Sequence, residues 1–293
     1  MKGLIVVNAY AKTTETRQVV RMREELLKLG INTDTVRNDL FFARVLSSDK
    51  IYSRLDGYDF CLYLDKDKYA SFALEKHMRL FNSASAIENC DDKMTTHLLL
   101  SDSGIPMPNT VAGLLCYDKS ATVSDDAVNM VVDTLGLPVV VKQAYGSMGT
   151  GVFKADDFAQ LKSLMQRFMC EPHLFQKYIA SSCGKDLRVI VVGGKVLGGI
   201  QRSSDNDFRS NIGLGGTAVK SDVPDVVQEY AVKAAELLGL DYCGIDFLYG
   251  EKPLLCEVNS NAFFDAFEQA TGINVAGAYA RHIAQVIDTS QKK

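Results

Sequence analysis

The sequence has 293 residues, of which 47% are hydrophobic and 23% charged, and its formal net charge is −4. A chain of this length exceeds the usual size of one hydrophobic core, so we expect two or three subdomains. The small net charge gives no general attraction to nucleic acid or to anionic membranes, and no apolar run in the sequence is long enough to span a bilayer.

Seven cysteines are scattered along the chain, and most of them lie in apolar runs. Their odd number and their spacing favour reduced thiols in a cytoplasmic protein over disulfides or zinc sites. The histidines also lack the spacing of metal ligands, so we interpret them as structural or surface residues; they are His77, His97, His173 and His282.

Residues 1–90 predict a small open α/β domain with a parallel sheet, because strand patterns alternate with helix patterns. Gly30 is expected to end the first helix. The expected elements are the strands Lys2–Val7, Ile31–Arg37, Asp59–Leu64 and Leu80–Asn82 and the helices Thr13–Leu29 and Lys68–His77.

Residues 91–178 predict a compact α+β unit. Asp91 or Asp92 is expected to cap a helix that runs to about Ser103, and the segment Ile105–Pro108 then extends the chain. The other expected elements are the helices Asp125–Leu135 and Asp156–Met169 and the strands Val139–Gln143, Gly151–Lys154 and Leu174–Tyr178.

Residues 179–293 predict a further unit with antiparallel strands, because Gly193 and Gly194 form a strong hairpin signal. The expected elements are the strands Leu187–Val192 and Lys195–Gln201, the hairpin Tyr242–Asn261, and the helices Pro224–Leu238, Ala262–Ala270 and Asn274–Val286.

The hairpin Tyr242–Asn261 is the most informative segment. Its fold sets Asp246 opposite Glu257, and Asn259 joins the same face because strand side chains alternate. Opposed like charges are destabilising unless a cation or donor intervenes, and a few carboxylates that leave room for phosphate oxygens suit Mg²⁺. The hairpin therefore predicts a Mg–nucleotide site. The alternative is an acidic face in water without function, behind an apolar face of Ile245, Phe247, Cys256 and Val258.

A glycine-rich loop follows the predicted strand Val139–Gln143. It contains Gly146, Ser147, Gly149, Thr150 and Gly151. The glycines let backbone amides approach a phosphate group, the hydroxyls add donors, and Lys142 adds a positive charge. The segment lacks the Gly-Lys-Ser/Thr of a Walker P-loop and leads into a strand, which excludes a Rossmann motif. The alternative is a flexible hairpin loop.

The segment Ile200–Gly216 combines arginines with further glycines. Arg202 and Arg209 suit bidentate capture of carboxylate or phosphate, and Asn211 lies beside them. A solvated polar loop is the alternative for this segment. Phe175–Ile179 has the form of a linker between two domains in which adenine commonly stacks, although its composition also fits an ordinary strand.

The ordered set of motifs closely resembles the ATP-grasp superfamily, with the RimK-like branch of glutamate and amino-acid ligases as the nearest match. The set comprises Lys93 at a helix start, Lys142 with its glycine loop, Gln-Lys-Tyr-Ile, Asp-Leu-Arg, Asp-Phe-Arg-Ser-Asn, Gly-Ile-Asp-Phe and Glu-Val-Asn. The resemblance runs from about Asp91 to the C-terminus. It implies an ATP-grasp fold, in which the α+β subdomains 91–178 and 179–293 clasp ATP and residues 1–90 form a preceding α/β domain.

The resemblance also implies roles for individual residues. Lys93 and Lys142 would bind the phosphates of ATP, and the loop Tyr145–Gly151 would close over them. The other nucleotide-binding residues implied are Gly146, Ser147, Met148 and Gly149 in the loop, Gln176, Lys177, Tyr178 and Ile179 around adenine, Asp186 near the ribose or phosphates, and Arg209 and Asn211 near the γ-phosphate. Asp246, Glu257 and Asn259 match the family's ligands for Mg²⁺, with Mn²⁺ as an alternative ion.

The activity implied by the resemblance is phosphorylation of a carboxylate by ATP, followed by attack of an amine on the acyl phosphate. Lys142 and Arg209 would stabilise the developing charge, and Arg202 would hold the donor carboxylate. The substrates would be small molecules or peptides, and the enzyme a possible homo-oligomer. The sequence departs from the family at Lys177, where an acidic residue is usual, and after Asn259. The rival interpretations are an ATP-grasp kinase acting on a hydroxyl and a catalytically silent nucleotide-binding module.

Overall fold

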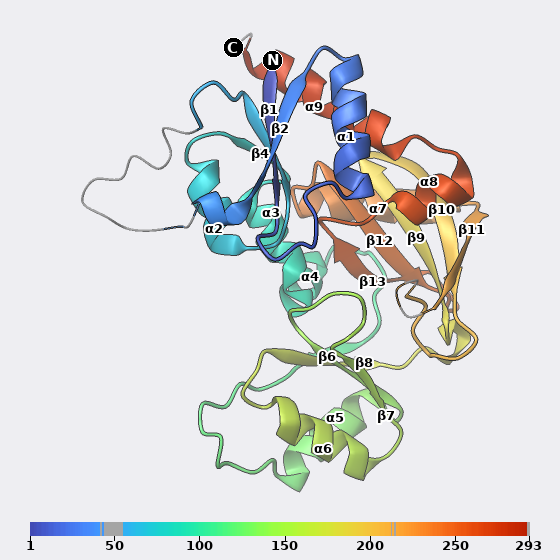
Figure 1. Cartoon of the computed structure of the whole chain (residues 1–293). Coiled ribbons are helices and arrows are strands. Elements are labelled where there is room, and N and C mark those ends of the chain that lie inside the picture. The colour runs from blue at the N-terminus through green and yellow to red at the C-terminus, as the bar shows by residue number, and fades with distance from the viewer. Residues whose placement is uncertain (42, 44–54, 212, 214, 292–293) are drawn as a thin grey trace.

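A computed structural model describes residues 1–41, 43, 55–211, 213 and 215–291 of the chain. Within these residues the strands form three sheets. Figure 1 shows two of the sheets packed together in an upper body, while the third lies in a lower body with its own helices. Across the same residues, none of the helices combines the length and the apolar character that a membrane crossing requires.

The N-terminal sheet has the strand order β2-β1-β3-β4, and its neighbouring strands are parallel as predicted. Strand β1 is buried from its second residue to its last, which suits a strand covered on both faces. Thr16 caps the following helix, because its side chain accepts a hydrogen bond from the Val19 amide. The elements are β1 (Lys2–Val7), α1 (Arg17–Lys28), β2 (Asn32–Arg37), a 3-10 turn η1 (Asn38–Phe41), β3 (Phe60–Leu64), α2 (Lys68–Glu75), β4 (Arg79–Phe81) and α3 (Ala84–Asp91), a helix that we did not predict.

The central sheet has the order β5-β8-β6-β7 and is antiparallel. Asp92 begins the helix that precedes it, because its carboxylate accepts hydrogen bonds from the amides of Met94 and Thr95. The elements are α4 (Lys93–Leu100), β5 (Thr110–Ala112), α5 (Asp125–Leu135), β6 (Val139–Gln143), β7 (Val152–Ala155), α6 (Phe158–Phe168) and β8 (His173–Lys177). The short strand β5 was not predicted.

The C-terminal sheet has the order β11-β10-β9-β12-β13 and is antiparallel throughout. Gly193 and Gly194, with φ of 54° and 72°, form the predicted turn between β9 and β10. The elements are η3 (Ala180–Ser182), β9 (Lys185–Val192), β10 (Lys195–Ser203), β11 (Thr217–Ser221), α7 (Asp225–Leu237), β12 (Tyr242–Leu248), β13 (Leu254–Asn259), α8 (Asp265–Thr271) and α9 (Val275–Gln291). Strand β11 was not predicted.

The N-terminal and C-terminal sheets share an apolar core, whereas the central sheet has a core of its own. One cluster joins Ile5 and Phe60 of the N-terminal sheet to Ile190 and Tyr242 of the C-terminal sheet, with α1 and α9 packed around it. The central sheet instead forms a separate core with α5 and α6, drawn from residues 111–175. Helices α3 and α4 pack into the core beneath the C-terminal sheet. The domain boundaries at residues 90 and 178 stay a prediction from the sequence.

Candidate active site

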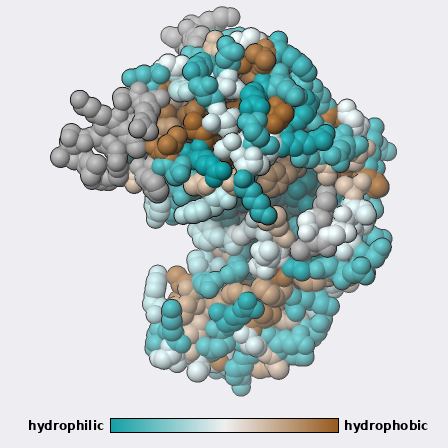
Figure 2. Space-filling view, viewed as in Figure 1, coloured by the Kyte–Doolittle hydropathy of each residue, from teal (hydrophilic) through white to brown (hydrophobic). Residues whose placement is uncertain are grey.

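A cleft lies between the central sheet and the C-terminal sheet and encloses about 890 Å³, part of which is open to solvent. Figure 2 shows the molecule narrowing to a waist where the lower body meets the upper body. Almost all of the predicted site residues line this cleft; they are Lys93, Lys142, Gly146, Ser147, Gly149, Gln176, Lys177, Tyr178, Ile179, Asp186, Arg202, Arg209, Asn211, Asp246 and Glu257. The cleft therefore gathers residues that are far apart in the sequence.

The hairpin β12–β13 confirms the predicted register. Asp246 pairs with Glu257, and Gly244 pairs with Asn259. The prediction that Cys256 lies on the apolar face was wrong, because the pairing shifts after Asp246 and leaves Cys256 as the extra residue of a β-bulge. Leu255 is fully buried in its place, and Cys256 lines the cleft.

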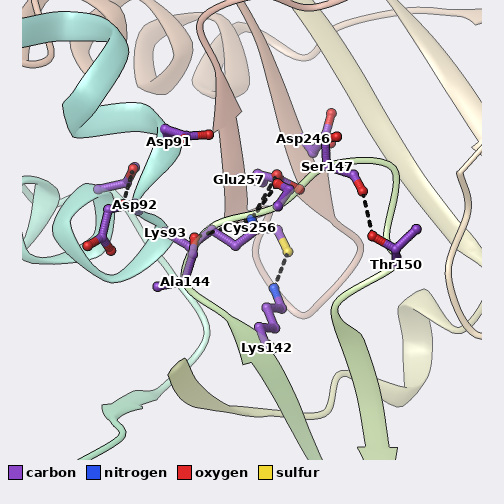
Figure 3. A network of polar contacts seen from close by, with 12 residues as sticks. Asp91, Asp92, Lys93, Lys142, Ala144, Ser147, Thr150, Asp246, Cys256 and Glu257 are labelled. Atoms are coloured by element: carbon purple, nitrogen blue, oxygen red, sulfur yellow. Dashed lines mark hydrogen bonds and ion pairs between the residues drawn. The ribbon is translucent and has the colours of Figure 1, made fainter. Parts of the chain in front are cut away.

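Two buried lysines approach the same part of β13 from different elements. Lys93 Nζ, at the start of α4, donates to the Gly146 carbonyl at 2.9 Å and lies 3.9 Å from Glu257 Oε1. Lys142 Nζ, on β6, lies 3.4 Å from Cys256 Sγ. Figure 3 shows both side chains pointing toward the Cys256–Glu257 segment. Burial lowers the pKa of Lys93, and the charge of Glu257 opposes that shift. Two lysine side chains therefore face the same part of the cleft.

The glycine loop contacts the segment that carries Arg209. Arg209 Nη1 donates to the Gly149 carbonyl at 2.5 Å, and Asp207 holds the guanidinium through Nε at 2.9 Å and Nη2 at 2.6 Å. Gly149 has a φ of +74°, and a Cβ there would lie 2.9 Å from Asn211 Oδ1. The left-handed backbone therefore favours glycine at this position. Met148 adopts a positive φ of 57° with an exposed side chain.

A buried network of carboxylates and guanidinium groups forms the floor of the cleft. Asp246 accepts hydrogen bonds from Arg188 Nε and Nη2, both at 2.7 Å, and from Arg202 Nη2 at 2.8 Å. Arg202 also binds Asp186 through Nε at 2.8 Å and through a second contact from Nη2. Asp186 accepts a further hydrogen bond from Ser210 at 2.5 Å. The network joins β9, β10 and β12 along one wall of the cleft.

Burial and neighbouring charges compete in this network. Burial raises the pKa of Asp186, and the charge of Asp246 adds to that shift. Burial alone would also raise the pKa of Asp246, but the two adjacent arginines hold it below its ordinary value. The pKa of Arg202 is raised by the two carboxylates, against the effect of burial. The charged forms of Asp246 and Arg202 are therefore favoured by their neighbours, whereas Asp186 is biased toward taking up a proton.

Of the three predicted metal ligands, Asp246 and Glu257 line the cleft, whereas Asn259 is not among its lining residues. Among the residues that the structure describes, Glu257 makes only the distant contact with Lys93, and the Asn259 Nδ2 donor is buried without a hydrogen-bond partner. Asp246 retains acceptor capacity, since a carboxylate offers about four lone pairs. Among the described residues, no three His, Cys, Asp or Glu side chains gather as a metal cluster. Mg²⁺ commonly binds one or two carboxylates and completes its shell with phosphate oxygens and water.

Some residues of the site were missed by the sequence analysis. Arg188 was noted only within a motif, although it pairs directly with Asp246 across β9 and β12. Ser210 was not singled out. His97 was interpreted as a structural or surface residue, yet it is 5% exposed and contacts the side chain of Gln176. A usable signal existed for His97, because it lies four residues after Lys93 and shares its helix face.

Comparisons with known proteins agree with this geometry. The family model described as "RimK-like ATP-grasp domain" matches residues 90–283. Human N-acetylaspartylglutamate synthase A is 37% identical over 217 residues, which are 73% of this chain and 54% of that protein. A probable alpha-L-glutamate ligase of Xanthomonas oryzae pv. oryzae is 35% identical over 213 residues, covering 71% of this chain and 70% of that protein. The matched part thus spans about half the length of the human relative.

The solved structures show the same fold at low sequence identity. The ATP-grasp ligase PsnB, complexed with a phosphomimetic variant of a minimal precursor, Mg and ADP, gives a TM-score of 0.67 at 19% identity. The likeness covers 97% of this chain and 98% of that one. The predicted ATP-grasp fold is therefore confirmed.

Proposed function

This chain belongs to the RimK-like ATP-grasp family, and from that premise we propose that it is an ATP-dependent ligase that joins a carboxylate to an amine. A substrate carboxylate oxygen attacks the γ-phosphorus of ATP, and ADP leaves. The amine nitrogen then attacks the acyl carbon, and inorganic phosphate leaves as the amide bond forms. The names of the two relatives above both contain glutamate, which makes glutamate the first substrate to test.

The observation that carries this proposal is a buried cation without a recorded counter-ion. Lys142 is 7% exposed, and its recorded partners are an amide oxygen and a thiol. Within the described part of the chain, Lys142 forms no ion pair. A buried charge is costly unless it is paired, so the site favours an incoming anion such as a phosphate group.

The proposed roles follow from the positions of the side chains. Lys93 and Lys142 bind phosphate oxygens, and Arg209 stabilises the charge on the transferred group. Arg202 already uses Nε and Nη2 on the floor of the cleft, so Nη1 is the group left to hold the donor carboxylate. Asp186 supports Arg202, and its own contact with the nucleotide stays a prediction.

The remaining nucleotide contacts are also proposed. The segment Gln176–Ile179 lines the cleft and provides backbone groups for adenine. The loop 145–151, which includes Met148, excludes water from the acyl phosphate. Asp246, Glu257 and Asn259 hold Mg²⁺, or Mn²⁺ in its place. The ion, when bound, supplies positive charge to the phosphate oxygens.

The experiment pairs the purified protein with ATP, Mg²⁺ and glutamate, together with N-acetylaspartate, citrate or short peptides. ADP release and product mass are measured. A ligase releases ADP in an amine-dependent manner, and hydroxylamine traps its acyl phosphate as a hydroxamate. A stable phosphorylated product without an amine requirement would instead establish a kinase. Absence of ATP binding by calorimetry would contradict both.

A further inference from the structure

A chain of buried hydrogen bonds extends from the phosphate-binding lysine away from the cleft. Lys142 Nζ donates to Gln176 Oε1 at 2.7 Å. Gln176 Nε2 lies 3.1 Å from His97 Nε2 and 3.0 Å from Thr110 Oγ1. Lys142, Gln176 and His97 are 7%, 2% and 5% exposed, so bulk water does not compete for these contacts.

The hydrogen-bonding capacity of each group determines which atom donates and which accepts in this series of hydrogen bonds. An ammonium group only donates, so the amide of Gln176 must present its oxygen to Lys142. Its NH₂ group then points away and needs acceptors. Thr110 accepts one hydrogen, because its own hydroxyl hydrogen is donated to the Pro108 carbonyl at 2.8 Å. His97 Nε2 must accept the other with its lone pair.

The surroundings of His97 keep that lone pair available. Burial lowers the pKa of His97 to about 4, and the nearby charge of Lys142 adds to the shift. The ring is therefore neutral at physiological pH and carries its proton on Nδ1, which lies 3.2 Å from Met107 Sδ. A half-turn of the Gln176 amide would place NH₂ against the ammonium of Lys142, and the acceptors on the far side oppose that rotation.

We propose that His97 is a positioning residue for Lys142, and that it acts by holding the Gln176 amide with its oxygen toward the lysine. Lys142 has a long flexible side chain, and the Gln176 oxygen fixes its Nζ at the phosphate side of the cleft. Helix α4 then contributes twice to the nucleotide site, directly through Lys93 and indirectly through His97 four residues later. The expected effect on ATP binding rests on the proposed function, but the position of the Lys142 side chain can be tested without nucleotide.

The test is a double-mutant cycle of His97→Leu and Gln176→Met with two readouts. The first is the rate of reductive methylation of Lys142 in the nucleotide-free protein, followed by peptide mass spectrometry. The second is the calorimetric Kd for Mg-ATP. His97→Gln retains an acceptor and is the conservative variant, and His77→Leu, at an exposed histidine, is the matched control. Circular dichroism verifies folding, and His97→Met replaces His97→Leu if the latter does not fold.

We expect His97→Leu to accelerate methylation of Lys142 and to weaken ATP binding, each about tenfold, the loss expected for one hydrogen bond that orients a charged group. His97→Gln and His77→Leu should stay within about twofold of wild type, and in the Gln176→Met background His97→Leu should have no further effect of that size. An unchanged methylation rate in His97→Leu, or equal acceleration in both backgrounds, would overturn the inference. If wild type binds no ATP while the methylation rates follow the cycle, the proposed function fails and the positioning role stands.

Discussion

Replacement of Asn82 by alanine should uncouple the N-terminal sheet from the strand that carries Asp246. Asn82 follows β4 and is 2% exposed. Its amide nitrogen donates to the carbonyls of Tyr242 and Ser260, each at 2.8 Å. Its oxygen accepts from the amides of Asp241 at 2.7 Å and Tyr242 at 2.9 Å. One side chain thus satisfies backbone groups at the start of β12 and just beyond β13.

The magnitude follows from these four contacts. A net contribution of roughly 1 kcal/mol for each hydrogen bond gives a loss of about 4 kcal/mol in the free energy of unfolding for Asn82→Ala. This is a large fraction of the roughly 5–15 kcal/mol that stabilises a typical domain. Water that enters the space left by the side chain would reduce the loss, because it can bind some of the same groups.

Urea denaturation of wild type and Asn82→Ala measures this loss, with Asn129→Ala as the matched control on the exposed face of α5. The control should change stability by no more than about 0.5 kcal/mol. A loss below about 1 kcal/mol for Asn82→Ala, with an unchanged denaturant slope, would refute the reasoning, since four buried backbone groups would then have lost a partner at almost no cost.

Three further predictions concern the site. Glu257→Gln should abolish Mg-ATP turnover with little change in the denaturation midpoint. Asp246→Asn should abolish turnover and also lower the free energy of unfolding by about 3 kcal/mol, because it leaves Arg188 and Arg202 short of negative charge. Equal stability of the two variants would contradict this difference. Lys142→Ala should weaken ATP binding as well as slow turnover. If calorimetry gave the variant the same Kd for ATP as wild type, the proposed binding of phosphate by Lys142 would be contradicted. The pKa of His97 is about 4 in the folded protein, compared with about 6.5 in the unfolded chain. Because the unfolded chain then takes up a proton that the folded protein does not, wild type should lose about 2 kcal/mol of stability as the pH falls from 8 to 5. His97→Gln should lose less, as urea titrations at both pH values would show.

The register of the hairpin β12–β13 could be predicted from the sequence because it is local. Alternation along two strands joined by a short turn places Asp246 opposite Glu257 without knowledge of any other strand. The bulge could not be predicted, since the extra residue at Cys256 depends on how β13 fits its neighbours. Helix α3 has only eight residues and a weakly amphipathic pattern, so its sequence did not separate it from a loop.

The floor of the cleft could not be predicted for a different reason. Arg188 and Arg202 reach Asp246 because β9 lies between β10 and β12, an order that sequence spacing does not dictate. The relay from Lys142 to His97 likewise joins β6, β8 and α4, which are brought together only by tertiary packing. Residues that act through other side chains leave no pattern of spacing in a single sequence.

The separate core of the central sheet has a consequence for how the molecule opens. The sheets of the upper body share one apolar cluster, so unfolding of either sheet would expose part of the other. Residues 111–175 form a core of their own and can therefore unfold as an independent cooperative unit. Amide hydrogens of β6 and β8 should therefore exchange through a lower free-energy opening than those of β1 and β12. A nucleotide bound in the cleft as proposed would contact both bodies and should bring the two exchange regimes together.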